Sequence, residues 1–188
     1  MKTKEEMPLK LLAHITDDNG VRKEQNLREH CVQTAEYASK SIGSTDLHHV
    51  VYLAGLLHDA GKAKKEYIEY LEDAFCGKPV IRGSINHTFA GVILIFEKYH
   101  LQTSTKWERL TCEIIGYAAG AHHGLFDCAD LDGNNGFLHR LRKDRKEICY
   151  DEAVKNYLEQ VADENLIEKH FQEAVKEVEK FFMIAKNT

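Results

Sequence analysis

An apolar run that ends in a histidine and an aspartate, Ala54–Asp59, is the feature that most constrains how this chain can fold. The residues before the pair, Val50–Leu57, are apolar almost all round a helix, which is typical of a helix buried on most of its sides. His58 and Asp59 then stand at the inner end of that helix, where an ionisable side chain needs a partner or a metal ion because its desolvation is costly. A small residue, a glycine and Lys62 follow at once, so the chain can bend directly after the pair. The sequence therefore predicts a central helix with a polar site at its end.

Most of the remaining chain shows apolar residues at helical spacing, interrupted by capping and turn residues. The expected helices cover residues 27–42, 47–57, 64–75, 85–99, 107–119, 153–161 and 166–182. We expect Asn26, Asp46 and Ser84 to cap the first, second and fourth helices, because their side chains accept hydrogen bonds from backbone N–H groups. The Asp17–Gly20 turn predicts a small β-hairpin or an extended arm, and strand signals are poor elsewhere. The predicted fold is therefore all-α, a helical bundle with a small N-terminal hairpin or arm.

Length and composition favour one domain of a cytoplasmic protein. A chain of 188 residues fits a single domain, and a hydrophobic content of 43% is enough for a core. We see neither a run of 18 apolar residues nor a secretory signal, so we expect no membrane span. Five scattered cysteines without a C-x-x-C pair indicate reduced thiols. The net charge of −5 differs from that of a typical nucleic-acid-binding module but leaves room for a local basic patch.

Histidines recur near the expected helix ends and supply partners for the His58–Asp59 pair. His30 lies beside the apolar stripe of the first helix, His87 in the first turn of the fourth, and His122–His123 directly after the fifth. These side chains can meet only if the helices pack as a bundle with these ends together. Several imidazoles with one shared carboxylate suit Mn, Fe, Co, Ni or Zn better than Mg or Ca. Two ions held roughly 3.5–4 Å apart commonly serve to hydrolyse phosphate esters, and Asp59 could bridge them.

Four short motifs follow one another in a specific order, whereas a lone His-Asp doublet is common by chance. They read L-x-E-H at Leu27–His30, G-L-x-H-D-x-G-K at Gly55–Lys62, N-H-T-x-x-G at Asn86–Gly91 and H-H-G at His122–Gly124. This pattern resembles the HD superfamily of metal-dependent phosphohydrolases. More narrowly, it is similar to the HD nuclease domain of Cas3, the CRISPR-associated effector of type I systems. The resemblance covers nearly the whole chain, and Leu12–His14 with its following turn also looks like the start of Cas3 proteins.

The resemblance implies a centre of one or two ions in which Asp59 is shared. The residues implied for one ion are His30, His58 and Asp59, and those implied for the other are Asp59, His87, His122 and His123. His58, Asp59 and Lys62 are the implied catalytic residues, with Lys62 close to a phosphate or to the leaving oxygen. The implied ions are Mn, Fe, Co or Ni, with Mg and Zn as further candidates.

The resemblance also implies a reaction and partners. The reaction is metal-dependent cleavage of single-stranded DNA, as the nuclease half of type I CRISPR interference. The partners are a Cas3 helicase domain, in cis or in trans, and through it the Cascade complex. One departure from the family concerns its last Asp ligand, which comes from a D-A-D-like segment of a C-terminal helix. That segment has no counterpart here, and Asp163 is the only Asp near the region, so residues 1–188 are expected to form a single HD nuclease domain without it.

Simpler interpretations stand beside the functional ones for two sets of residues. The basic cluster could be a solvated helix face, a track for the phosphates of single-stranded DNA or a docking surface for the helicase. It comprises Arg140, Arg142, Lys143, Arg145 and Lys146. The remaining histidines are expected at the surface, although His14 could approach the site. They are His14, His48, His49, His100, His139 and His170.

Two rival functions stay open at this point. Another HD phosphohydrolase would act on a nucleotide or a cyclic dinucleotide, and a pocket shaped for a base and a ribose would favour it. A catalytically impaired module would only bind Cas partners or nucleic acid, and the missing C-terminal Asp supports it.

Overall fold

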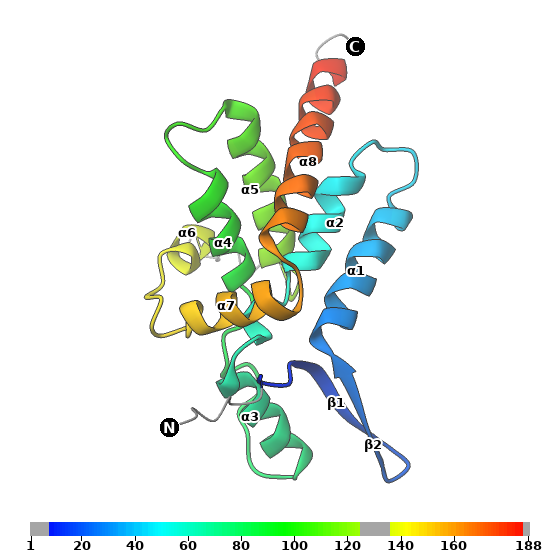
Figure 1. Ribbon diagram of the computed structural model, residues 1–188, viewed down its shortest axis with the longest axis vertical. Coiled ribbons are helices and arrows are strands. Elements are labelled where there is room, and N and C mark those ends of the chain that lie inside the picture. Colours follow the sequence, from blue (N-terminus) through cyan, green and yellow to red (C-terminus); the bar gives the residue numbers. More distant parts are fainter. Residues whose placement is uncertain (1–7, 125–135, 186–188) are drawn as a thin grey trace, which may run out of the picture.

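The computed structural model describes residues 8–124 and 136–185, which fold into helices with one small hairpin (Figure 1). In chain order the elements are β1 (Leu12–Asp18), β2 (Val21–Asn26), α1 (Leu27–Ser41), α2 (His48–Leu57), the 3-10 turn η1 (Ala60–Lys62), α3 (Lys65–Phe75), α4 (Ala90–Tyr99), α5 (Lys106–Gly120), α6 (Gly136–Leu141), α7 (Tyr150–Gln160) and α8 (Glu164–Ala185). The expectation of a mainly helical fold is confirmed. Among these described helices, none combines the length and the apolar character that a membrane crossing requires.

The N-terminal segment is a hairpin rather than an extended arm. β1 and β2 pair antiparallel across a turn in which Asn19 and Gly20 have φ angles of 55° and 83°. The Gly20 N–H donates to Asp17 Oδ1 at 2.7 Å, which closes the turn. β2 leads directly into α1, and the side chain of Asn26 caps this helix as predicted by accepting from the backbone N–H groups of Arg28 and Glu29.

Helix α2 lies at the centre of the bundle and packs against α1, α5 and α8 (Figure 1). Its apolar character explains this place, because Leu53, Leu56 and Leu57 are all fully buried. A Cβ atom at Gly55 would lie 2.9 Å from Ala35 Cα, so the backbones of α1 and α2 are in direct contact. The central helix therefore reaches the site with its last turn held from several sides.

The predicted cap of α2 is wrong. Asp46 is not the capping residue, because its carboxylate pairs with Lys180 instead. The side chain of Glu177, on α8, accepts from the backbone N–H groups of His49 at 2.9 Å and Val50 at 3.1 Å. A carboxylate from a distant helix thus satisfies the free donors at the start of α2, where a negative charge is also favourable.

The helix predicted over residues 85–99 begins five residues late, at Ala90. Ser84 caps no helix, and His87 lies in the irregular segment before α4. Two backbone carbonyls of this segment are engaged elsewhere: Lys64 Nζ donates to Asn86 O at 3.0 Å, and the Gly61 N–H donates to His87 O at 3.1 Å. These tertiary hydrogen bonds use carbonyl groups that the first turn of a helix would need, so no helix forms before Ala90. The predicted loop at residues 126–136 lies outside the described residues except for Gly136, where α6 begins.

Candidate metal centre

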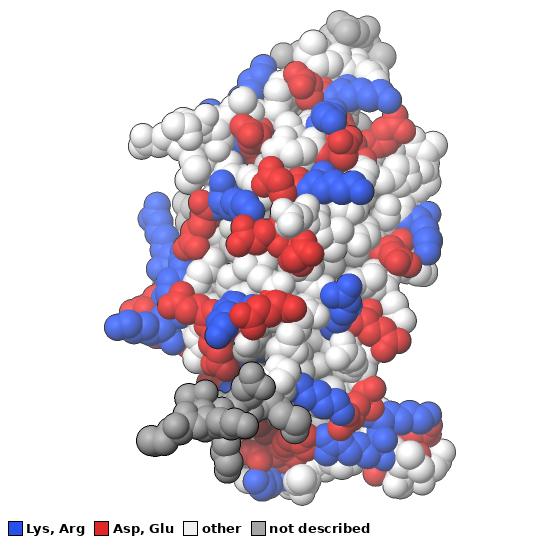
Figure 2. All heavy atoms as spheres, viewed as in Figure 1, with Lys and Arg blue, Asp and Glu red and all other residues white. Residues whose placement is uncertain are grey.

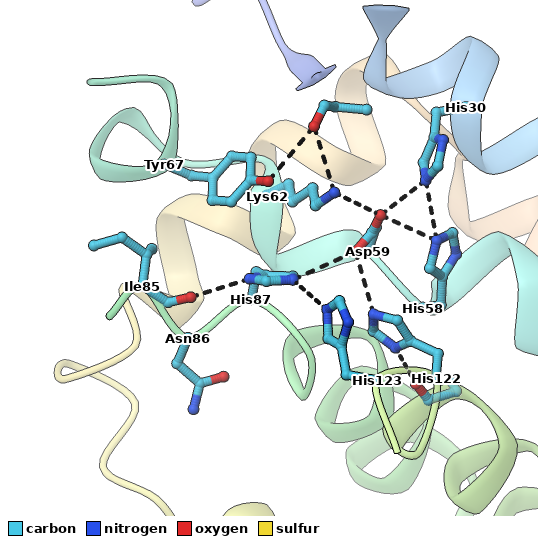
Figure 3. A network of polar contacts seen from close by, with 12 residues as sticks. His30, His58, Asp59, Lys62, Tyr67, Ile85, Asn86, His87, His122 and His123 are labelled. Atoms are coloured by element: carbon cyan, nitrogen blue, oxygen red, sulfur yellow. Dashed lines mark hydrogen bonds and ion pairs between the residues drawn. The ribbon is translucent and has the colours of Figure 1, made fainter. Parts of the chain in front are cut away.

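Five imidazoles converge on the carboxylate of Asp59, directly after the end of α2 (Figure 3). His30 comes from the first turn of α1, and His58 stands beside Asp59 at the end of α2. His122 and His123 follow the end of α5, and His87 belongs to the segment before α4. The sequence-predicted ligands thus meet in one place, although they come from four separate parts of the chain.

The first ligand group consists of His30, His58 and Asp59. The Nε2 atoms of His30 and His58 lie 2.9 Å and 3.0 Å from Asp59 Oδ2 and 3.1 Å from each other. His58 Nδ1 donates to Gly55 O at 2.7 Å, so its proton is on Nδ1 and the Nε2 lone pair faces the centre. A backbone carbonyl that orients an imidazole in this way is the usual outer support of a metal-binding histidine.

The second ligand group consists of Asp59, His87, His122 and His123. Asp59 Oδ1 lies 3.5 Å from His122 Nε2 and 3.8 Å from His87 Nε2, and the Nε2 atoms of His87 and His123 are 2.8 Å apart. His122 Nδ1 donates to Ala119 O at 2.7 Å and His87 Nδ1 donates to Ile85 O at 3.0 Å, so these rings also turn Nε2 towards the centre.

A divalent cation fits these residues on the chemistry of their donor atoms. Within the described part of the chain, Asp59 Oδ1 and His122 Nε2 are buried and have no hydrogen-bond partner. An acceptor and a lone pair buried side by side are costly unless something positive lies between them. The nitrogen and oxygen donors in each group lie within 4.8 Å of one another. Imidazole and carboxylate ligands together suit a divalent transition metal.

The electrostatics of the site favour the protonation states that bind metal. Burial alone would raise the pKa of Asp59, which is 2% exposed, but its contacts with His122, His30 and His58 hold that pKa far below the usual range. Burial lowers the pKa of His87 to about 4, although the hydrogen bond to Ile85 O opposes this. At neutral pH Asp59 is therefore ionised and His87 is neutral, as metal ligands must be.

Lys62 is the cation nearest to the shared carboxylate. Its side chain is 4% exposed, and Nζ lies 2.9 Å from Asp59 Oδ2. Nζ also lies 5.3 Å from the ring centroid of Tyr67 and within 3.4 Å of Ala13 O (Figure 3). The ammonium group is thus fixed beside the ligand groups, where it can contact an anion bound there.

A cleft of about 800 Å³ opens beside the ligand groups. Its walls come from α3, from the segment before α4 and from the region of α6, and they include His14, Lys62, Tyr67, Tyr70, Arg82, His87, His123, His139, Arg140 and Lys143. Four of the residues around it are Lys or Arg, and none of the described ones is Asp or Glu. Elsewhere, Figure 2 shows acidic and basic side chains interspersed over the viewed face. The cleft is therefore a local positive region in a chain of net charge −5.

The structure divides the predicted basic cluster. Arg140 and Lys143 line the cleft, whereas Arg142 does not. Arg145 is engaged by Glu97, with its Nε and Nη2 atoms 3.0 Å and 2.8 Å from Glu97 Oε1. Lys146 is exposed and lies outside the cleft. Two of the five residues are thus near the ligand groups.

The other histidines mostly lie away from the centre. His48 Nδ1 is 2.8 Å from Ser39 O, and the Nδ1 atoms of His49 and His170 are 3.0 Å apart. His100 Nε2 lies 2.8 Å from Glu113 Oε1. His14 approaches the site, as the sequence allowed, with its ring 5.1 Å from that of His30. His139 is exposed, as expected, and also lines the cleft.

Asp163 does not take the place of the missing C-terminal Asp ligand. It is exposed, and its Oδ1 accepts from the backbone N–H of Leu166 at 2.8 Å, which caps α8. Sequence analysis missed two residues near the centre, Arg82 in the cleft and the buried Lys64. Their closeness to the motifs in sequence is the signal that could have revealed them. Arg82 lies four residues before the N-H-T motif, and Lys64 lies two residues after the H-D-x-G-K motif.

A helical bundle that gathers imidazoles around one shared aspartate, next to a positive cleft, defines an HD-type metal-dependent hydrolase centre. The family described as "Cas3, HD domain" matches residues 1–187. The chain therefore belongs to the Cas3 HD domain family, a family of CRISPR-associated HD nucleases. Searches of curated proteins and of solved structures find no match.

Proposed function

We propose that this chain is a metal-dependent nuclease that cleaves single-stranded DNA in type I CRISPR interference. The observation that carries the proposal is the buried pair Asp59 Oδ1 and His122 Nε2, which face each other without a hydrogen-bond partner in the described structure. Family membership supports the nuclease class. In this proposal residues 1–188 act as one domain in the cytoplasm, with a Cas3 helicase domain and the Cascade complex as partners.

Each residue of the centre has a distinct role in the proposed reaction. His30 and His58 hold one side of Asp59, and His87, His122 and His123 hold the other, so the carboxylate fixes both ligand groups relative to each other. Bound Mn, Fe, Co or Ni ions, with Mg and Zn as further candidates, would supply Lewis-acid stabilisation and lower the pKa of water. Lys62 places an ammonium group beside the centre, where it can neutralise charge on a phosphate or on the leaving oxygen.

The cleft supports a phosphodiester strand as substrate. Arg82, Arg140 and Lys143 extend the positive region outward from Lys62, which suits successive phosphates better than one isolated group. Tyr67 and Tyr70, with ring centroids 6.0 Å apart, also stand in this wall. Tyr67 is buried at 5% exposure, whereas Tyr70 is only partly buried. The Tyr70 ring favours a second candidate function, hydrolysis of a nucleotide or a cyclic dinucleotide, because it could stack on a base.

The test is nicking of circular single-stranded DNA by the purified chain with Mn²⁺, Co²⁺ or Ni²⁺. We expect cleavage with metal, loss of cleavage with a chelator, and no cleavage by Asp59→Ala, which should also bind less metal. Nucleotides, cyclic dinucleotides and bis(p-nitrophenyl) phosphate serve as parallel substrates. Activity on nucleotides alone would favour the second candidate, and metal binding without any hydrolysis would favour a module that only binds its partners. Full cleavage by Asp59→Ala would refute the shared-carboxylate centre.

A further inference from the structure

Lys64 is a buried lysine that the proposed chemistry does not use. Its side chain is 1% exposed, although it carries a positive charge. Nζ donates to Asn86 O and to Ile148 O, both at 3.0 Å, and lies 3.2 Å from Glu66 Oε2. An ammonium group has three N–H donors, and these contacts supply three acceptors. A buried charge satisfied this completely indicates that it has a specific structural task.

The partners of Lys64 join three parts of the molecule around His87. Lys64 stands between η1 and α3, Asn86 immediately precedes His87, and Ile148 lies just before α7. The backbone of His87 is held a second time, because the Gly61 N–H donates to His87 O at 3.1 Å. Two adjacent carbonyl groups of the His87 segment are therefore fixed by residues that follow Asp59 within one short stretch of chain.

His87 differs from the other ligands in the way the backbone holds it. His30 lies within α1, His58 is the C-cap residue of α2, and the His122–His123 pair follows the C-cap residue of α5, so each of these positions is in a helix or within three residues after the end of one. His87 lies in an irregular segment that ends where α4 begins. Its place opposite Asp59 Oδ1, at 3.8 Å, therefore depends on tertiary contacts.

We infer that Lys64 is a positioning residue that holds His87 in place as a ligand of the group formed by Asp59, His87, His122 and His123. The inference rests on the metal centre of the proposed function and goes beyond it in a specific respect. It assigns to one lysine, which contacts no ligand side chain, a supporting role for one ligand group and not for the other. Loss of Lys64 should weaken metal binding at the second group and leave the group of His30, His58 and Asp59 intact.

The test separates the two ligand groups before Lys64 is changed. A His30→Ala background retains the second group, and a His122→Ala/His123→Ala background retains the first. Cobalt(II) is titrated into each protein and followed by its visible absorption, with and without Lys64→Met. We expect the affinity to fall roughly 10–100-fold in the His30→Ala background, as for lost outer supports of metal ligands. We expect no change in the other background and partial recovery with Lys64→Arg.

The control is Arg109→Met, which removes another contact between a cationic side chain and a carbonyl, from Arg109 to Ser104 O at the far end of α5. It should change stability without changing either cobalt affinity. Should Lys64→Met fail to fold, Lys64→Gln replaces it, because its amide retains a donor but has a shorter reach. Equal losses in both backgrounds, or an unchanged affinity in the His30→Ala background, would overturn the inference. If the His30→Ala protein binds no cobalt even with Lys64 present, the second metal group itself is wrong.

Discussion

Gly61→Ala should damage the metal centre without touching any ligand side chain. A Cβ atom at Gly61 would lie 2.3 Å from His87 O and 2.7 Å from His87 Cα. Real Cβ contacts are essentially never shorter than 3.0 Å, so the backbones of residues 61 and 87 must separate by at least 0.7 Å, the difference between 3.0 and 2.3 Å, and this displaces His87 relative to Asp59. Metal–ligand distances tolerate only about 0.2 Å. We expect roughly 100-fold slower hydrolysis, since a displacement of about 1 Å at a catalytic centre can have this effect.

The assay combines hydrolysis of bis(p-nitrophenyl) phosphate with cobalt(II) titration and urea denaturation. Overpacking in Gly61→Ala should also cost about 1–3 kcal/mol of stability. Gly43→Ala is the control, because Gly43 has a φ of +70° and open space around its Cβ position. That variant should lose stability through backbone strain and retain hydrolysis. Normal hydrolysis and normal cobalt affinity in Gly61→Ala would refute the argument that close backbone contact sets the position of His87.

Three further predictions concern the cleft, the central helix and one histidine outside the centre. Arg82→Ala/Lys143→Ala should make binding of single-stranded DNA less dependent on salt, because two phosphate contacts are lost. The slope of log K against log salt concentration, measured by fluorescence anisotropy, should become shallower by about 1.4, whereas Arg142→Ala should leave it unchanged. Glu177→Ala should lower the free energy of unfolding in urea by about 1–2 kcal/mol through loss of the α2 cap, with cobalt affinity unchanged. Burial lowers the pKa of His170 to about 4 from its usual 6.5. Because the unfolded chain protonates this histidine at a higher pH than the folded chain does, the free energy of unfolding should fall as the pH drops from 6.5 to 4. His170→Phe should flatten that fall in urea denaturation at several pH values, and an unchanged profile would contradict the assignment.

The hairpin and the first helix could be predicted from sequence because their signals are local. Asp17 closes its turn by accepting from the backbone N–H of Gly20, three positions later. Asn26 caps α1 by accepting from the backbone N–H groups two and three positions later. The start of α2 shows the opposite case. Asp46 has the right chemistry for a cap, but Glu177 is 128 positions from His49 and takes the role through packing of α8. Local pattern cannot reveal such a partner, because any exposed carboxylate on a later helix would look the same.

The structure gathers around Asp59 the same residues that the motif order implies as ligands, but their arrangement depends on packing that the sequence does not encode locally. His30 and His58 stand at helical positions, so a correct helix assignment already brings them to the same end of the bundle. The basic cluster was predicted as one unit, and the structure separates Lys143 in the cleft from Arg145 on Glu97. Nothing in the order of charges distinguishes these two residues, because the carboxylate that engages Arg145 comes from α4.

The segment around His87 shows why a strong helical pattern can fail at a functional position. Apolar spacing and Ser84 both favour a helix from residue 85, yet α4 begins only at Ala90. A helix there would require its first carbonyls to accept from N–H groups four residues later. Lys64 and Gly61 engage the carbonyls of Asn86 and His87 instead, and Gly61 can do so because it has no Cβ. The irregular backbone brings the His87 ring to within 3.8 Å of Asp59 Oδ1, so local helix propensity gives way where a ligand of the centre must be placed.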